Sequence, residues 1–403
     1  MRLLHTSDWH IGHYFFGYDR KTEHIFFFDW LKRVIKEQQI DALLVAGDIF
    51  DSPNPSAISQ RIYYKFLKEA TTENPHLQII IIAGNHDSAA RLEAPLPLLE
   101  EMNVFIKGTI CKNTAGEIDY QSLFIPLTCR EKTEAWCITV PYLRQGDYPN
   151  AESYSQGVKK MYEVLYQEVQ KIKGENQPII VMGHLQATGS EISENDRSER
   201  TIVGGLECVS PEVFDKTDIV YTALGHLHKG QRVSKRENVR YAGSPLPMSF
   251  SEKYYKQGVN LVELVNGQLE RIERIHFDPP VKLISLPPDP KPLNEVLKEL
   301  MILAEGETTA QSPYLEIKVL ITEPEPSMRH QIEEALRNKA VRLTSAVPYR
   351  QRKEHTTESI TYEELKNMEP IEMAKDIFSR KYGNEMPEKM ASLLMQVIQE
   401  VGK

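Results

Sequence analysis

The chain has 403 residues and a formal net charge of −9, with 41% hydrophobic and 26% charged residues. This length suits two or three globular domains, and the composition allows a sizeable buried core. The acidic balance excludes a chain-wide basic footprint for nucleic acid, so any such binding needs a local patch, bound cations or a partner. No apolar run approaches the ~20 residues of a membrane span and no signal peptide precedes the first apolar run, so we expect a cytoplasmic protein without membrane contact.

Residues 1–250 alternate short apolar runs with amphipathic stretches. The apolar runs predict five strands, most of them buried on both faces: Arg2–His5, Ala42–Ala46, Gln78–Ala83, Pro178–Met182 and Ile219–Leu224. Helical spacing of apolar residues predicts helices over His24–Gln39, Ala57–Ala70 and Ser155–Lys173. We expect β hairpins within 104–142 and a polar loop close to the active site over 187–210. Together these elements predict a layered α/β domain over residues 1–278.

A proline-dense stretch, FDPPVKLISLPPDPKP at 277–292, predicts a domain boundary. Alternating patterns then predict a small α+β domain, assigned to 279–355, from helix Leu293–Ala304, strand Tyr314–Ile321, helix Pro326–Lys339 and strand Ala340–Val347. The last segment, 356–403, contains two amphipathic helices at about 370–383 and 387–401. Their apolar stripes lie beyond a proline-rich linker, which favours binding to a partner, with packing against the chain's own body as the alternative.

Each of the five predicted strands is followed by residues that can bind a metal or transfer a proton. These are Asp8 and His10 in SDWH, Asp48 in GD, Asn85, His86 and Asp87 in GNHD, His184 in GH, and His226 and His228 in GHLH. In open α/β sheets, functional groups gather outside the carboxyl ends of the strands, so we expect these side chains to share one site.

The candidate ligands are two carboxylates, one amide oxygen and four imidazoles, with no thiolate. Oxygen and nitrogen ligands without sulfur suit Mn²⁺, Fe or Zn²⁺. Seven ligands are too many for one ion but suit two ions that share a carboxylate. A site with two metals clamps the attacking and leaving oxygens of a displacement at phosphorus, which indicates phosphoester hydrolysis.

The ordered set D-x-H, GD, GNHD, GH and GHxH resembles the calcineurin-like metallophosphoesterase superfamily over roughly residues 1–230. Within that superfamily, TSDWHIG, AGDIFD, GNHDS, GHLHK and YAGSPLPMSFSE (241–252) resemble the SbcD family, the nuclease subunits of bacterial SbcCD complexes. The resemblance implies a layered metallophosphoesterase fold, with central β-sheets flanked by helices. A small α+β capping domain and C-terminal helices would follow it.

The resemblance also implies roles for the residues at the strand ends. One ion would be held by Asp8, His10 and His228, the other by Asn85, His184 and His226, with Asp48 bridging both; the family prefers Mn²⁺. His86 matches the family's catalytic histidine, which is not a metal ligand and would protonate the leaving oxygen or orient the scissile phosphate. Asp87 either orients His86 by a hydrogen bond or caps the helix that begins near Ser88.

The family resemblance implies a DNA nuclease that works in repair and recombination with SbcC, an SMC-like ATPase. Such enzymes degrade duplex ends as ATP-dependent exonucleases, cut single strands and open hairpins. ATP binding by SbcC agrees with the lack of a G-x-x-x-x-G-K-[ST] loop in this sequence. An enzyme of the same fold that hydrolyses small phosphoesters, such as cyclic nucleotides, is the alternative.

Two interaction surfaces follow from the same resemblance. A homodimer within a heterotetramer would use Ala57–Ala70 and Ala89–Glu100. The basic run YRQRKEH offers Arg350, Arg352 and Lys353 for contact with DNA phosphates, and a solvated charged face is the alternative.

Overall fold

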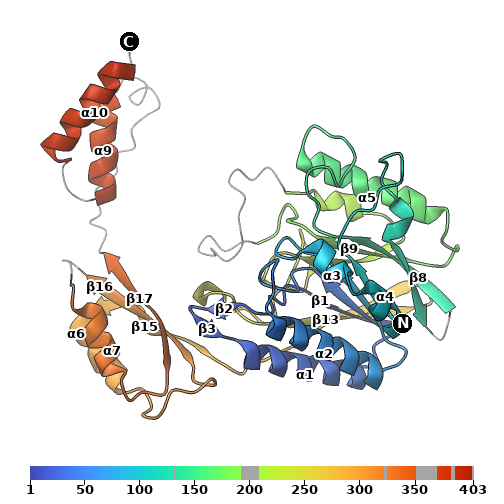
Figure 1. Ribbon diagram of the computed structural model, residues 1–403, viewed down its shortest axis with the longest axis horizontal. Coiled ribbons are helices and arrows are strands. Elements are labelled where there is room, and N and C mark those ends of the chain that lie inside the picture. Colours follow the sequence, from blue (N-terminus) through green and yellow to red (C-terminus); the bar gives the residue numbers. More distant parts are fainter. Residues whose placement is uncertain (130–131, 192–207, 322–324, 351–369, 383–385, 402–403) are drawn as a thin grey trace.

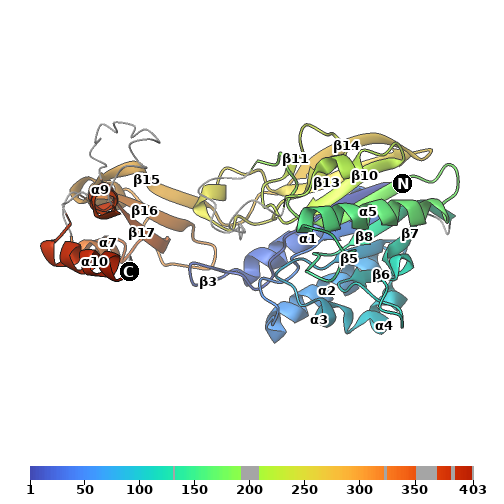
Figure 2. The ribbon, with the colours of Figure 1, turned by 90° about the horizontal axis from the view of Figure 1, so that it is seen from above.

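The computed structural model describes residues 1–129, 132–191, 208–321, 325–350, 370–382 and 386–401. A large body contains two six-stranded sheets, and a smaller module built on a three-stranded sheet lies beside it (Figure 1, Figure 2). Beyond the module, helices α9 (Pro370–Tyr382) and α10 (Glu388–Val401) form a pair at the chain end (Figure 1). Within the described residues, no helix has both the length and the apolar character needed to cross a membrane.

The first sheet of the body has the strand order β14-β13-β1-β4-β5-β6. Strands β1, β4, β5 and β6 run parallel, whereas β13 pairs antiparallel with both β1 and β14. The strands are β1 (Arg2–Thr6), β4 (Ala42–Ala46), β5 (Gln78–Ile82), β6 (Val104–Lys107), β13 (Gly258–Val265) and β14 (Gln268–His276). The expectation of hairpins throughout 104–142 is wrong for β6, because this strand adds to the edge of the parallel sheet.

The second sheet has the order β11-β12-β10-β9-β8-β7. Strands β8, β9, β10 and β12 run parallel, and β7 forms a hairpin with β8. The strands are β7 (Phe124–Cys129), β8 (Lys132–Val140), β9 (Ile179–His184), β10 (Ile219–Gly225), β11 (Gln231–Arg232) and β12 (Val239–Tyr241). The hairpin expected in this region is therefore present, although it occupies only 124–140.

The two sheets pack face to face, with helices on the outer side of each. In β4, Leu43 and Val45 pack toward the helices, whereas Leu44 and Ala46 enter the layer between the sheets. Because side chains alternate along a strand, covering both faces requires apolar residues at every position, as the sequence predicts. The first sheet is covered by α1 (Lys21–Glu37) and α2 (Ala57–Glu73), and the second by α5 (Tyr154–Gln170). Short helices α3 (Ala89–Glu93), α4 (Leu96–Leu99), η1 (Glu100–Met102), η2 (Tyr120–Leu123) and η3 (Pro211–Phe214) complete the body.

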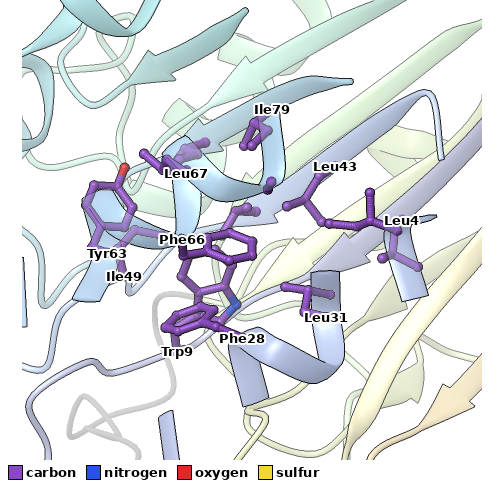
Figure 3. Packing of buried hydrophobic residues seen from close by; sticks show 14 of the residues in the cluster. Leu4, Trp9, Phe28, Leu31, Leu43, Ile49, Tyr63, Phe66, Leu67 and Ile79 are labelled. Atoms are coloured by element: carbon purple, nitrogen blue, oxygen red, sulfur yellow. The ribbon is translucent and has the colours of Figure 1, made fainter. Parts of the chain in front are cut away.

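The loop after β1 is anchored to this core by Trp9, which lies between two candidate ligands. The buried indole packs edge-on against Phe28 of α1 and Phe66 of α2, with ring centroids 5.0 and 5.5 Å away (Figure 3). Its Nε1–H donates to Thr6 Oγ1 at 2.9 Å. Helix packing therefore determines where the flanking residues Asp8 and His10 lie.

The smaller module contains three parallel strands, β15 (Leu283–Pro292), β16 (Tyr314–Ile321) and β17 (Arg342–Arg350). Helices α6 (Leu293–Met301) and α7 (Met328–Ala335) share an apolar core with this sheet. The sequence treats 277–292 as a proline-dense boundary, but much of it is β15. Pairing with β16 shifts register between Leu286 and Lys291, so the prolines in between need not donate to the ladder.

The module meets the body at a small apolar cluster that we call the joint, made of Phe15, Phe250, Val281 and Tyr314. Phe15 belongs to the hairpin of β2 (Tyr14–Phe15) and β3 (Tyr18–Asp19), and Phe250 begins the 3-10 helix η4 (Phe250–Glu252). Polar contacts flank the cluster. Tyr314 Oη donates to Glu23 Oε1 at 2.7 Å, and Tyr18 Oη donates to the carbonyl of Leu343 at 3.1 Å.

Candidate metal centre

The seven candidate ligands come together at one end of the two sheets. Strands β1, β4 and β5 deliver four of them from the first sheet, and β9 and β10 deliver three from the second. The carboxyl ends of these parallel strands therefore lie at a shared edge, as the sequence predicts. The seven residues are Asp8, His10, Asp48, Asn85, His184, His226 and His228.

One group, called the first half here, consists of Asp8, His10 and His228. Possible ligand atoms of these three buried residues all lie within 4.8 Å of one another. The rings of His10 and His228 meet edge-on, with centroids 5.2 Å apart. The Asp8 carboxylate also accepts the backbone N–H of His226 at 3.0 Å, which links the end of β1 to the end of β10.

The other group, the second half, consists of Asn85, His184 and His226. Asn85 Oδ1 lies 3.0 Å from His184 Nε2 and 3.1 Å from His226 Nδ1, so one amide oxygen and two imidazoles face the same point. Asp48 lies between the halves: its Oδ2 is 3.3 Å from His184 Nε2 and 3.7 Å from His10 Nε2.

The backbone at the site adopts conformations that few residues tolerate. Asp8, His10, Asp48 and His226 have φ values of 52°, 45°, 51° and 102°. Left-handed backbone at residues other than glycine costs energy and is concentrated at functional sites. A glycine is needed beside them, since a Cβ on Gly84 would lie 2.1 Å from Asp48 Oδ1. The glycine that precedes Asn85 therefore makes room for the carboxylate between the halves.

The electrostatics favour positive charge beside Asp48. Burial alone would raise the pKa of Asp48, but the charge and hydrogen bond of His184 outweigh it and hold the pKa below its usual range. Burial lowers and Asp48 raises the pKa of His184, with a net pKa of about 9. Burial keeps the pKa of His226 near 3 and raises that of Asp8 above its ordinary value. At neutral pH the centre thus combines the Asp48 carboxylate with a protonated His184 and a neutral His226.

The donor set and an unsatisfied histidine fit a metal centre. Both ring nitrogens of His10 are buried without a hydrogen-bond partner, although Nδ1 lies 3.4 Å from Asp51 Oδ1. Buried polar atoms are normally paired, and a metal ion is one of the few partners that can satisfy such an imidazole. Among the described residues, the ion pairs of Asp48 are with His10 and His184. The residues present therefore fit divalent cations.

His86 lies at the edge of the centre and is partly exposed. Its Nδ1 is 3.0 Å from the carbonyl of Asp51, and its ring meets that of His10 edge-on with centroids 4.9 Å apart. Its backbone N–H donates to Asp48 Oδ1 at 2.8 Å. With Nδ1 donating to a carbonyl, Nε2 is the nitrogen that can exchange a proton with a substrate.

Asp87 has a different set of partners from either of the two expected. Its buried carboxylate accepts backbone N–H groups from Ile49, Phe50 and Gly84 at 2.9 to 3.1 Å. Burial, reinforced by the charge of Asp48, raises its pKa to about 6. Asp87 therefore connects the loop after β4 with the loop after β5, and so holds Asp48 near Asn85.

Two orienting residues escape sequence reasoning. Glu252 Oε1 lies 3.0 Å from His228 Nδ1, and Asp51 approaches His10. Glu252 ends the motif YAGSPLPMSFSE, so the motif was visible, but no local spacing connects it with His228. The backbone carbonyl of Ala46, 2.8 Å from His184 Nδ1, cannot be recognised from residue type at all.

The residues predicted to contact DNA are not part of the metal centre. Arg350 ends β17, and the side chains of Arg350, Arg352 and Lys353 lie outside the described residues, as does most of the polar loop expected over 187–210. The flanks of that loop meet where Ala187 pairs with Val209.

Comparison with known families agrees with the geometry of the centre. Residues 1–230 match the family model described as calcineurin-like phosphoesterase. The chain belongs to the calcineurin-like phosphoesterase family. Residues 279–382 match a second model, described as the type 5 capsule protein repressor C-terminal domain.

Three relatives within the calcineurin-like phosphoesterases are named as the SbcD component of the nuclease SbcCD. The one from Rhodobacter capsulatus is 37% identical over 355 residues, covering 85% of this chain and 86% of that protein. The one from Escherichia coli K12 is 33% identical and covers 68% of each chain. The one from Bacillus subtilis is 32% identical, over 66% of this chain and 67% of that protein. This phosphoesterase is therefore a member of the SbcD family.

Proposed function

We propose that the protein is the metal-dependent nuclease subunit of an SbcCD-type complex and hydrolyses DNA phosphodiester bonds. The observation that carries this proposal is the convergence of five strand ends on one cluster of buried carboxylates, a half-buried amide and imidazoles. The relatives are named as nucleases, which supports a nucleic-acid phosphodiester as the substrate. With SbcC and ATP it degrades duplex ends, and it cuts single strands and opens hairpins, in the cytoplasm where the bacterial chromosome lies.

The two halves hold two divalent cations, most naturally Mn²⁺. Asp8, His10 and His228 bind one ion, and the second half binds the other. Asp48 contributes to both, since its Oδ2 approaches a histidine of each half. When bound, such ions neutralise phosphate charge and lower the pKa of a water nucleophile. The oxygen and nitrogen donors agree with a hard or borderline ion rather than a thiophilic one.

His86 acts on the substrate rather than on the ions. Its partly exposed ring lies beside His10, while the Asp51 carbonyl fixes Nδ1. Nε2 is then available to donate a proton to the leaving oxygen or to hold the scissile phosphate. The hydrogen bonds of Asp87 to the loops keep this histidine and Asp48 at a constant separation.

The terminal helices bind an SbcC-type ATPase. Ile377 in α9 and Met390, Leu393 and Met395 in α10 are all exposed, with relative exposures of the residues from 49% to 63%. Large apolar side chains gathered on two helices at a chain end favour a protein partner. We assign residues 1–278 to the nuclease domain, 279–355 to a capping domain that contacts DNA, and 356–403 to partner binding.

A homodimer would place two such nuclease subunits in one complex. Ile58 in α2 and Leu98 in α4 have relative exposures of 55% and 74%, and they lie within the segments Ala57–Ala70 and Ala89–Glu100. Light scattering of the isolated chain at micromolar concentration tests this, and a monomer across that range would contradict it.

A labelled DNA hairpin tests the function directly. The protein is assayed with and without Mn²⁺, SbcC and ATP, beside a cyclic nucleotide as the competing substrate class. We expect hairpin cleavage that requires Mn²⁺ and is extended by SbcC with ATP. Hydrolysis of the cyclic nucleotide without DNA cleavage would contradict the proposal. Replacing His86 by Ala should abolish cleavage while both ions still bind.

A further inference from the structure

Glu252 is a buried carboxylate close to the centre but outside the seven proposed ligands. Its side chain is fully buried. One oxygen, Oε1, lies 3.0 Å from His228 Nδ1, and the other accepts the backbone N–H of Met248 at 2.8 Å. Burying a carboxylate is costly unless its hydrogen bonds are made, so the position of Glu252 against an imidazole calls for a functional reason.

A carboxylate at Nδ1 determines how an imidazole can bind a metal. When Nδ1–H donates to Glu252, the proton is fixed on that nitrogen, and the opposite edge of the ring carries the lone pair of Nε2. Asp8 and His10 lie within ligand distance of His228. In His184, by contrast, the same role belongs to the backbone carbonyl of Ala46. The orientation of His228 thus depends on the side chain of a separate segment.

That segment is η4, which connects the metal centre to the joint. Phe250, two residues before Glu252, packs against Phe15 with ring centroids 5.6 Å apart. Phe15 in turn packs against Tyr314 of β16 at 4.7 Å. Two rings therefore connect the helix that carries Glu252 with the first residue of a strand in the module.

The residue after Glu252 also binds the module. Lys253 Nζ donates to Ser285 Oγ of β15 at 2.9 Å, and Ser285 donates to Glu316 Oε2 of β16 at 3.0 Å. Glu252 is thus flanked by two attachments to the module, one by aromatic packing and one by hydrogen bonds. A shift of the module relative to the body would move η4 from both sides.

We propose that Glu252 is a positioning residue for His228, and that the seating of the module at the joint sets how tightly the first half binds its ion. The inference rests on the proposed function, because it takes His228 as a ligand. It makes the module a modulator of metal occupancy in addition to any contact with DNA. A partner or substrate that moves the module would act on one half of the centre and not the other.

The substitution Glu252→Gln tests the positioning role with little change in shape. An amide N–H facing His228 Nδ1 favours the tautomer whose proton lies on Nε2, where the ion must bind. We expect calorimetric titration of the full chain with Mn²⁺ to show a first-half affinity weakened by about 10- to 100-fold, with the second half unchanged. Glu93→Gln is the matched control, because Glu93 accepts the backbone N–H groups of Gly108 and Thr109 and contacts no proposed ligand.

The substitution Tyr314→Phe tests the connection to the module. It removes the hydroxyl that bonds Glu23 but keeps the ring in the joint. We expect the first-half affinity to fall by about two- to tenfold, the range that one lost hydrogen bond can supply. Tyr166→Phe is the control, since Tyr166 donates to Asp218 at 2.8 Å on the outer side of the second sheet. Wild-type affinity in Tyr314→Phe would overturn the coupling to the module.

A third variant separates this inference from the proposed function. His228→Ala should remove one of two bound Mn²⁺ ions. If it keeps both, the ligand assignment fails. If it loses one while Glu252→Gln binds like the wild type, the ligand assignment stands and the positioning role is overturned. Should Glu252→Gln fail to fold, Glu252→Asp withdraws the carboxylate by one methylene and is measured in its place, with the same expected loss.

Discussion

The two halves of the metal centre differ in what orients their histidines. In the second half, His184 is held by the carbonyl of Ala46, within the strands themselves. In the first half, His228 is held by Glu252 and His10 is approached by Asp51, both from segments outside the sheets. The second half is therefore built into the rigid core, whereas the first depends on loops and, through η4, on the joint. Binding events elsewhere in the molecule can therefore change metal binding by the first half, because they can move these segments.

Replacing Asp48, which lies between the halves, should weaken metal binding by both halves together. Asp48→Asn removes the shared charge, so we expect both Mn²⁺ ions to bind poorly and hairpin cleavage to fall by about a thousandfold or more. Metal titration and single-turnover cleavage provide the measurement. Retention of one tightly bound ion would show that Asp48 serves one half alone.

The anchor of the first half can be removed without touching a ligand. Trp9→Ala deletes a buried indole between Asp8 and His10, and we expect it to lower the free energy of unfolding by about 3–5 kcal/mol. In the protein that remains folded at low temperature, the first ion should bind more weakly than the second. Denaturant unfolding and Mn²⁺ titration test the two parts. Equal weakening of both ions would contradict the division into halves.

The second half has a single shared oxygen. Asn85→Ala removes the amide that faces both His184 and His226. Because a proposed ligand is lost, we expect the second ion to be absent after dialysis while the first is retained. The comparison with His228→Ala is direct, because each variant should spare the half that the other damages.

Beneath the centre, His5 joins the two sheets that supply the halves. It is fully buried, and its Nδ1 lies 2.8 Å from Tyr221 Oη of β10. Burial, assisted by the charge of Arg274, lowers the pKa of His5 from 6.5 to about 3. The unfolded chain therefore binds a proton below pH 6.5 that the folded protein does not, so stability is full above pH 6.5 and is lost as the pH falls toward 3.

The contribution of His5 should be about 1.4 kcal/mol per pH unit within that window. The free energy of unfolding is measured with urea at pH 7.5 and pH 5 for the wild type and for His5→Asn. The contribution of His5 is the difference between the two proteins in how much this free energy changes with pH. Identical pH dependence in the two proteins would contradict the assignment. Since His5 supports both sheets, we expect no preference for either half of the centre.

Most strands of the body could be predicted, because the apolar runs that form them are visible in short stretches of the sequence. Four of the five parallel strands are apolar at nearly every position, and the strands β4 and β16 begin and end at the predicted residues. The gathering of the candidate ligands within each sheet follows from the parallel arrangement, since the carboxyl ends of parallel strands share an edge. The contact of Asp48 with His184 also requires the two sheets to pack face to face, and no local pattern shows this.

The remainder depends on contacts that no local pattern shows. The four prolines of β15 suggest a linker, yet a register shift against β16 accommodates them in a strand. Strand β14 has no buried residue because it lies at the edge of the first sheet. The hydrogen bond of Glu252 to His228 joins residues 24 positions apart, and it connects η4 with the end of β10.

The central claim is that one binuclear centre has two separable halves, and the stoichiometry of bound Mn²⁺ tests it most directly. Metal analysis after equilibrium dialysis is applied to the wild type, His228→Ala and Asn85→Ala. The account predicts two ions per wild-type chain and one in each variant, with both ions retained in a Glu93→Gln control. One ion in the wild type, or two in both ligand variants, would contradict it.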